Sequence, residues 1–254
     1  MDLMPVSWIL DPTLQILVSS QLITLPPELK AAVDAHWDAI LVRQPHYFKG
    51  PVLSVETITF SGMQWTIRAR FTDYAHYLYS RFQLPSSHPH RVRVLFAAAL
   101  VISQDRYLIA GVMGQETARP GWIQSIGGSP VFQDVADEVF DPIRSTNQEL
   151  KEETGLSPEA LRLSRKPQVL GCTVDGNGSV AIAVGYFSRL TSVELKDLIK
   201  QSWKSTAQPH ARRELADIVA IPLGQSGINW MRNRRERHVR YLERMVRELQ
   251  DWPV

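Results

Sequence analysis

The 254-residue chain contains a single cysteine, Cys172. One cysteine excludes an internal disulfide, and scarce cysteine is typical of proteins kept in a reducing compartment. We interpret Cys172, on a predicted strand, as a small core residue, with a nucleophilic thiol as the alternative. The chain is therefore expected to be cytoplasmic.

Long apolar runs and an excess of one charge are also absent. No run reaches the ~20 residues that a membrane helix needs, and MDLMPVSWIL has no basic segment before its apolar stretch. We therefore expect neither a membrane anchor nor a secretory signal. The formal net charge is only +2, which gives little reason to expect nucleic acid as a partner.

The composition fits a folded enzyme. Hydrophobic residues make up 44% of the chain and charged residues 21%, so a sizeable core in one or two domains is expected. The clearest boundary is the proline-containing segment LPSSHPH at 84–90. We expect an N-terminal unit over 1–90, a catalytic domain over 91–222 and a C-terminal helical part over 223–254.

Residues 1–90 are predicted to form a small α+β unit. Helical spacing of Leu29, Val33, Trp37 and Ile40 predicts a helix over 27–42. Two strands at 52–60 and 64–71 form a hairpin, and a second helix covers 73–82.

The middle part alternates apolar segments with turn residues. We expect strands at 92–102, 107–112, 122–126, 169–174, 180–186 and 218–221, and helices at 142–154 and 193–203. This order predicts an α/β/α sandwich with a mixed sheet. After it, one amphipathic helix is expected over 227–250, with an arginine-rich face and an apolar stripe. We interpret it as a packed surface helix, with nucleic acid or membrane binding as the alternatives.

The most informative segment ends in QELKEETGL, residues 148–156. Asp141 and Pro142 predict the start of a helix, and Gly155 predicts its end. In that helix Ile143 and Leu150 face the core. Glu149, Glu152 and Glu153 lie at i, i+3 and i+4, so they share one face. Grouped carboxylates suit Mg²⁺ or Mn²⁺, especially with substrate phosphates; a solvated acidic face is the alternative.

The stretch from Gly127 to Leu156 resembles the signature of the Nudix hydrolases. That signature has a glycine, a spaced glutamate and then Arg-Glu-hydrophobic-x-Glu-Glu-x-Gly-hydrophobic, and residues 149–156 match it in full. The resemblance covers about 91–222. It implies the α/β/α sandwich, a divalent cation as cofactor, and hydrolysis of a nucleoside diphosphate linked to another group.

Two positions depart from the signature. Gln148 stands where the family has arginine, and about six residues are inserted if Gly128 begins the motif. In the family, the arginine pairs with the first glutamate. An insertion that moves the glutamate leaves the arginine without its partner. Both changes are expected in a working variant site and also in a decayed one; the three intact glutamates favour a working site. Glu138 is a candidate for the displaced glutamate.

The resemblance assigns roles to further residues. Glu149, Glu152 and Glu153 would hold the metal, and the general base would be Glu152, Glu153 or Glu214, for which a surface role is the alternative. Gly127 and Gly128 would present backbone amides to the diphosphate. The segment before them would contact the substrate through Arg119, Trp122 and Gln124, although Trp122 also fits a core position.

One branch of the family, the UDP-glucose and UDP-galactose hydrolases, is the most similar. The similarity consists of a tryptophan-containing helix leading to QPHYF at 44–48, of Gln148, and of the segment 210–214. It implies release of UMP and a sugar 1-phosphate. The alternatives are a hydrolase acting on ADP-ribose, a dinucleotide or coenzyme A, and a non-catalytic nucleotide-binding domain.

Overall fold

A computed structural model describes residues 8–10, 13–62, 64–117, 119–205, 214–233 and 237–252. The chain divides into two compact units. The first comprises residues 1–96, 129–141 and 172–181, and the second comprises 97–128, 142–171 and 182–254.

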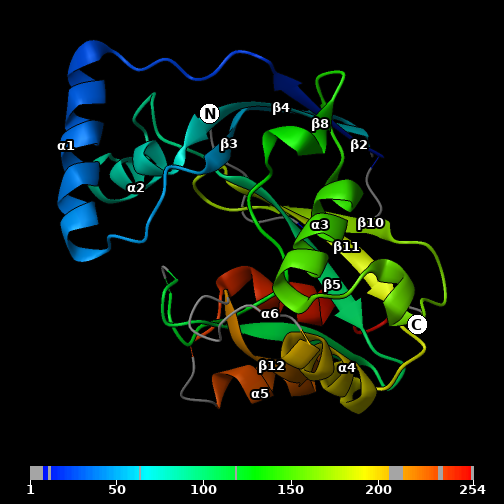
Figure 1. The fold of residues 1–254 in the computed structure, drawn as a ribbon. Coiled ribbons are helices and arrows are strands. Elements are labelled where there is room, and N and C mark those ends of the chain that lie inside the picture. Colours follow the sequence, from blue (N-terminus) through cyan, green and yellow to red (C-terminus); the bar gives the residue numbers. More distant parts are fainter. Residues whose placement is uncertain are drawn as a thin grey trace. The chain divides into compact units, whose positions relative to one another are not determined.

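The first unit contains a mixed five-stranded sheet. Its order is β3-β4-β2-β9-β8. Strands β3 (Pro51–Ser61) and β4 (Gln64–Asp73) are antiparallel, which confirms the predicted hairpin, and β2 (Thr13–Ser19) runs parallel to β4. Helices α1 (Pro27–Arg43) and α2 (Tyr74–Gln83) lie side by side (Figure 1).

The two helices of this unit were predicted from sequence and are confirmed. They pack through the buried residues Val33, Trp37, Ala75 and Leu78. Asp73 caps α2, because its carboxylate accepts a hydrogen bond from the His76 N–H at 2.8 Å.

The insertion after the glycine pair has a structure that the sequence did not predict. It contains a 3₁₀ helix, η1 (Phe132–Asp134), and a small hairpin of β8 (Val135–Ala136) and β9 (Val139–Phe140). Strand β9 pairs with β2 through Val139 and Leu17. The insertion is therefore an integral part of the first unit's sheet.

The larger sheet has most of its residues in the second unit. Its order is β1-β10-β11-β5-β6-β12, and β7 pairs with β6. The strands are β1 (Trp8–Leu10), β5 (Leu95–Ile102), β6 (Tyr107–Met113), β7 (Ile123–Gln124), β10 (Gln168–Val174), β11 (Val180–Phe187) and β12 (Leu215–Pro222). The two sheets and their helices confirm the mixed α/β class that was predicted.

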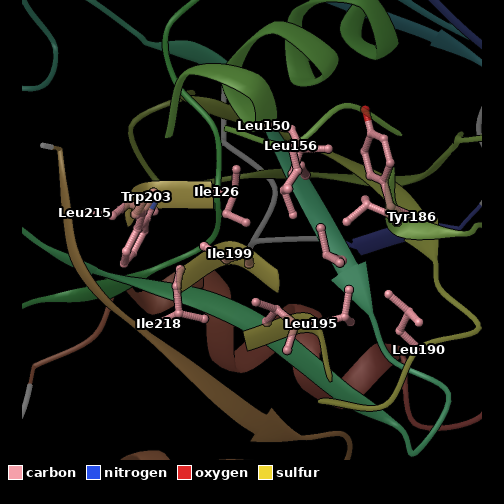
Figure 2. Packing of buried hydrophobic residues seen from close by; sticks show 14 of the residues in the cluster. Ile126, Leu150, Leu156, Tyr186, Leu190, Leu195, Ile199, Trp203, Leu215 and Ile218 are labelled. Atoms are coloured by element: carbon pink, nitrogen blue, oxygen red, sulfur yellow. The ribbon is translucent and has the colours of Figure 1, made fainter. Parts of the chain in front are cut away.

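One face of this sheet packs against α3 (Pro142–Thr154) and α4 (Ser192–Ser205). Leu150 of α3 and Ile199 and Trp203 of α4 belong to a single buried cluster with strand residues such as Ile218 (Figure 2). Side chains alternate along a strand, so the equally buried Leu100 points to the opposite face. The sheet is thus covered on both sides, as an α/β/α arrangement requires.

The prediction of one C-terminal helix over 227–250 was wrong. The structure has two helices, α5 (Gln225–Arg232) and α6 (Arg240–Glu248). Residues 237–239 pair with β7: the Ile123 N–H donates to the Arg237 carbonyl at 2.8 Å, and the Val239 N–H donates to the Ile123 carbonyl at 3.1 Å. Pairing with β7 replaces helical hydrogen bonds at this point. The predicted apolar stripe is nevertheless buried, namely Val239, Leu242, Val246 and Leu249.

No helix in the described part of the chain has both the length and the hydropathy to span a bilayer.

Candidate active site

Helix α3 begins at Pro142 and ends at Thr154, as predicted. Gly155 has φ +73, a conformation that favours glycine, and its N–H donates to the Lys151 carbonyl at 2.9 Å. A Cβ at Gly155 would also lie 2.2 Å from Ser202 Oγ. The local signals therefore set both ends of the helix that carries the glutamates.

Tyr186 of β11 holds the buried side of α3. Its side chain is fully buried, and its hydroxyl donates to Asn147 Oδ1 at 2.7 Å. The same hydroxyl lies 2.7 Å from Thr146 Oγ1. Leu150 is buried one turn further on, which confirms its predicted core position. These contacts fix the rotation of α3.

The three glutamates of α3 differ in exposure. Glu152 is exposed, Glu149 is half-buried, and Glu153 is only 6% exposed. Along the helix face that was predicted to carry all three, the exposure of the side chains thus falls from Glu152 to Glu149 to Glu153. Glu153, at the buried end, is the residue most constrained by its surroundings.

Glu153 is bonded to the glycine turn. Its Oε2 accepts a hydrogen bond from the Gly127 N–H at 3.0 Å, and Trp203 Nε1 donates to its backbone carbonyl at 2.9 Å. Gly127 has φ +141, and a Cβ there would lie 2.4 Å from the Ala97 carbonyl oxygen. Only glycine fits this close approach of β5, the turn and α3.

Glu149 lies over the second glycine. A Cβ at Gly128 would be 2.3 Å from Glu149 Oε1 and 2.7 Å from its Cδ. The absent side chain of Gly128 therefore provides the space that the Glu149 carboxylate occupies. The glycine pair and two of the three glutamates form one structure, as their predicted shared role requires.

Burial and repulsion between carboxylates act strongly on Glu153. Burial raises the pKa of Glu153 well above 4.5, and the nearby charges of Glu214, Glu149 and Glu152 raise it further. The hydrogen bond from Gly127 opposes this shift. Four carboxylates therefore share one electrostatic environment.

Glu214 precedes β12, and its backbone carbonyl accepts a hydrogen bond from the Gly114 N–H at 2.7 Å. The residue keeps an exposed surface, yet burial of its carboxyl group and then repulsion from Glu152 raise its pKa. The structure thus brings Glu214 to the carboxylates of α3. Residues 210–213 of the same predicted segment lie outside the described residues.

The carboxylates suit a divalent cation in their chemistry. Glu153 Oε1 is buried and has no hydrogen-bond partner, and a hard oxygen in that state is a suitable ligand for Mg²⁺ or Mn²⁺. Over the described residues, however, no three His, Cys, Asp or Glu side chains are close enough together to form a ligand set. The assignment of Glu149, Glu152 and Glu153 as metal ligands stays a prediction.

Gln148 takes part in the acidic face. Its Nε2 donates to Glu152 Oε1, one helical turn further along α3. The neutral amide thus contacts one of the predicted ligands. Glu138, the candidate replacement for the family's first glutamate, is exposed in the β8–β9 turn of the first unit, and its role also stays a prediction.

The segment before the glycine pair carries the predicted substrate contacts. Arg119 lies over the half-buried Trp122, with its Cζ 4.8 Å from the ring centroid. Gln124 is half-buried on β7, opposite Gly111 of β6.

Cys172 is fully buried, and burial raises its thiol pKa to about 12, so the core interpretation of the cysteine is confirmed.

Sequence reasoning did not single out two residues from the C-terminal part, Tyr241 and Arg237, of which Arg237 was included only as one of the arginines of the basic face. The Tyr241 hydroxyl of α6 lies 2.9 Å from Ser125 Oγ. Burial raises the pKa of Tyr241 to about 12; the charge of Glu153 also raises it, and that of Arg119 lowers it. The second residue is Arg237, whose Cζ lies 6.0 Å from the Trp122 ring centroid. Their only sequence signal was an arginine-rich segment.

No family profile matches the chain, and no curated protein matches it. Among solved structures, the chain is similar to a bifunctional NMN adenylyltransferase/ADP ribose pyrophosphatase from Francisella tularensis. The TM-score is 0.43 at 19% identity, over 70% of this chain and 45% of that one.

Two further structures are similar at lower identity. DR0079 from Deinococcus radiodurans has a TM-score of 0.41 at 12% identity, over 61% of this chain and 81% of that chain. RenU, a Nudix hydrolase from M. smegmatis, has a TM-score of 0.29 at 11% identity, over 50% of this chain and 68% of that one.

Proposed function

We propose that the protein hydrolyses the pyrophosphate bond of a nucleoside diphosphate linked to a second group, with a divalent cation bound by Glu149, Glu152 and Glu153. The observation that carries the proposal is the contact between the glycine turn and the glutamates of α3. Gly127 donates to Glu153 at 3.0 Å, and Gly128 leaves room for Glu149. A glycine turn that a phosphate can approach closely thus adjoins carboxylates that can face a cation.

In this proposal, different groups of the chain bind the diphosphate and the cation. The turn at Gly127 and Gly128 positions the diphosphate, and the carboxylates of α3 hold the cation. A bound cation would neutralise phosphate charge and acidify a water molecule. Glu153 and Glu214 both have raised pKa values, and a carboxylate with a raised pKa is a stronger base, so either of them in its ionised form is a candidate to accept a proton from that water. Glu152 is the third candidate for the general base.

UDP-glucose and UDP-galactose are the substrates that the sequence favours, with UMP and a sugar 1-phosphate as products. ADP-ribose, a dinucleotide and coenzyme A are the alternatives within the same chemistry. A non-catalytic nucleotide-binding domain is the alternative outside it. Two observations favour that last reading: no complete ligand set is formed among the described residues, and Gln148 is bonded to Glu152.

The test is a panel of UDP-glucose, UDP-galactose, ADP-ribose, NADH and coenzyme A, each with Mg²⁺ and then with EDTA. Products are separated by chromatography. Glu153→Gln is the inactive variant, and Glu28→Gln, an exposed glutamate of the first unit, is its matched control. Release of UMP and sugar 1-phosphate that EDTA and Glu153→Gln both abolish supports the proposal.

The other outcomes are equally decisive. Turnover of a different member keeps the mechanism and replaces the substrate. Full activity of Glu153→Gln removes α3 from the mechanism. Absence of turnover from folded protein, together with nucleotide binding, favours the non-catalytic domain.

A further inference from the structure

Two guanidinium groups from distant parts of the chain lie near the Trp122 ring. Arg119 precedes it on the same loop, with Cζ 4.8 Å from the ring centroid, and Arg237 approaches from the C-terminal part, with Cζ at 6.0 Å. Both distances are within the range of cation–π contacts. Two positive charges therefore lie within about 6 Å of one indole ring.

Backbone hydrogen bonds fix this arrangement. The Trp122 N–H donates to the Arg119 carbonyl at 3.1 Å, and the Met113 N–H donates to the Trp122 carbonyl at 2.8 Å. On the other side, the Ile123 N–H donates to the Arg237 carbonyl at 2.8 Å. The Arg119 carbonyl is thus bonded to Trp122, which pairs with β6, and the Arg237 carbonyl is bonded to β7. These bonds limit the positions that the two guanidinium groups can reach.

The charges of the two arginines are not neutralised within the described chain. No described carboxylate forms an ion pair with Arg119 or Arg237, whereas Arg232 pairs with Glu243 at 2.8 Å and Arg244 with Glu248 at 2.9 Å. A guanidinium group without a carboxylate partner attracts an anion. The arrangement therefore suits an anionic ligand.

The cluster of Arg119, Trp122 and Arg237 lies close in sequence to the glycine turn through Trp122. Trp122 immediately precedes β7, which leads to Gly127. Ser125, which follows β7 and precedes Gly127 by two residues, lies with its Oγ 2.9 Å from the Tyr241 hydroxyl of α6, so α6 contacts the segment between Trp122 and the glycine turn. An anion at the arginines would thus lie in the same part of the second unit as the candidate active site.

We propose that Arg119 and Arg237, oriented by Trp122, bind a phosphate group of the substrate. Guanidinium groups are planar donors that match phosphate oxygens in pairs. Since arginines approach the ring of Trp122, the indole serves as a platform for them rather than for a nucleobase. The cluster therefore recognises the diphosphate and is indifferent to the base. The identity of the anion as a substrate phosphate rests on the proposed function.

Binding of inorganic pyrophosphate in EDTA tests the site directly, by isothermal titration calorimetry. Arg119→Gln and Arg237→Gln should each weaken binding by about tenfold or more, as expected for loss of charged hydrogen bonds. Arg247→Gln is the matched control, because Arg247 is an exposed arginine of α6, and it should bind within about twofold of the wild type. Arg119→Lys and Arg237→Lys keep the charge and provide folded variants if the glutamine variants fail to fold.

Two results would overturn the inference: wild-type protein that binds no pyrophosphate, or arginine variants that bind it as the wild type does. Turnover separates this failure from failure of the proposed function. If the wild type turns over a substrate and the arginine variants keep its KM, the arginine site is wrong and the function stands. If no substrate turns over but pyrophosphate binding depends on both arginines, the site stands and the function is wrong.

Discussion

The Glu149 carboxylate occupies the position that a side chain on Gly128 would need: an added Cβ would lie 2.3 Å from its Oε1. At the neighbouring Gly127, an added Cβ would instead meet backbone, 2.4 Å from the Ala97 carbonyl oxygen and 2.9 Å from the Ala98 Cα. The two glycines are therefore required for different reasons, one by the carboxylates and the other by the fold.

Gly128→Ala should impair the site while preserving the fold. The clashing atoms are the end of a flexible side chain, and Gly128 is not among the glycines with positive φ, so the free energy of unfolding should change by less than about 1 kcal/mol. Glu149 must move, and a displaced ligand can lower turnover roughly a hundredfold. Urea unfolding and steady-state kinetics measure the two effects. Unchanged kinetics would show that the position of Glu149 is irrelevant to the reaction.

Gly127→Ala should instead destabilise the protein. The residue has φ +141, and the clashing atoms belong to the backbone of β5, so the free energy of unfolding should fall by about 2 kcal/mol or more. Gly176→Ala is the control, because a Cβ there meets nothing within 4 Å. Equal stability of the two variants in urea unfolding would contradict the close approach at Gly127.

Gln148→Arg should not increase turnover. Gln148 already contacts Glu152, and an arginine at that position would pair with the same carboxylate one turn along the helix. A paired Glu152 is a weaker ligand, so the Mg²⁺ concentration for half-maximal activity should rise by about threefold or more. Gln148→Ala removes the contact and should not raise it. A large gain in activity from arginine would instead reveal an acidic partner for it at another position.

The sequence predicted those elements whose signals are local. Asp141-Pro142 and Gly155 set the limits of α3, and the residues around Gly62 set the hairpin of β3 and β4. The join between α5 and α6 was missed because residues 232–238 contain no glycine or proline that would signal the end of a helix. Only the tertiary pairing of Arg237 and Val239 with β7 makes residues 237–239 extended.

For the candidate active site, too, the sequence predicted the residues that are close together in the chain and not those that come from distant segments. The spacing predicted that Glu149 and Glu153 share one face of the helix, and the glycine pair was predicted to face the same diphosphate, but the contacts between the glycines and the glutamates were not predicted. No spacing could reveal Tyr241 or Arg237, since folding brings them to Ser125 and Trp122 from the other end of the chain. The β8–β9 hairpin was missed because each of its strands has only 2 residues, too few to show alternation.

Tyr186→Phe should destabilise the protein by about 1–2 kcal/mol. The hydroxyl is buried and donates to Asn147 Oδ1 at 2.7 Å, so its removal leaves a polar group of α3 without that donor. Tyr107→Phe is the control, because Tyr107 is only half-buried and should lose little stability. Equal unfolding free energies in urea would show that Tyr186 does not hold α3 through its hydroxyl.

Stability in EDTA should depend on pH through Glu153. Its pKa in the folded protein is raised well above 4.5 by burial and by neighbouring carboxylates. Between 4.5 and the raised value, the folded protein holds a proton that the unfolded chain has released, so the free energy of unfolding falls as pH rises. The contribution is fully present below the unfolded pKa and is lost as pH rises through the folded pKa.

Glu153→Gln removes this titration and should be more stable than the wild type at high pH but not at low pH. Urea unfolding in EDTA from about pH 4 to about pH 8 measures the difference. Mg²⁺ should reduce it at high pH, because a cation bound to the ionised carboxylate stabilises only the folded wild type. A difference that does not vary with pH would show that Glu153 is not held in its neutral form. A pH-dependent difference that Mg²⁺ leaves unchanged would remove Glu153 from the metal site while keeping it as a buried carboxyl group.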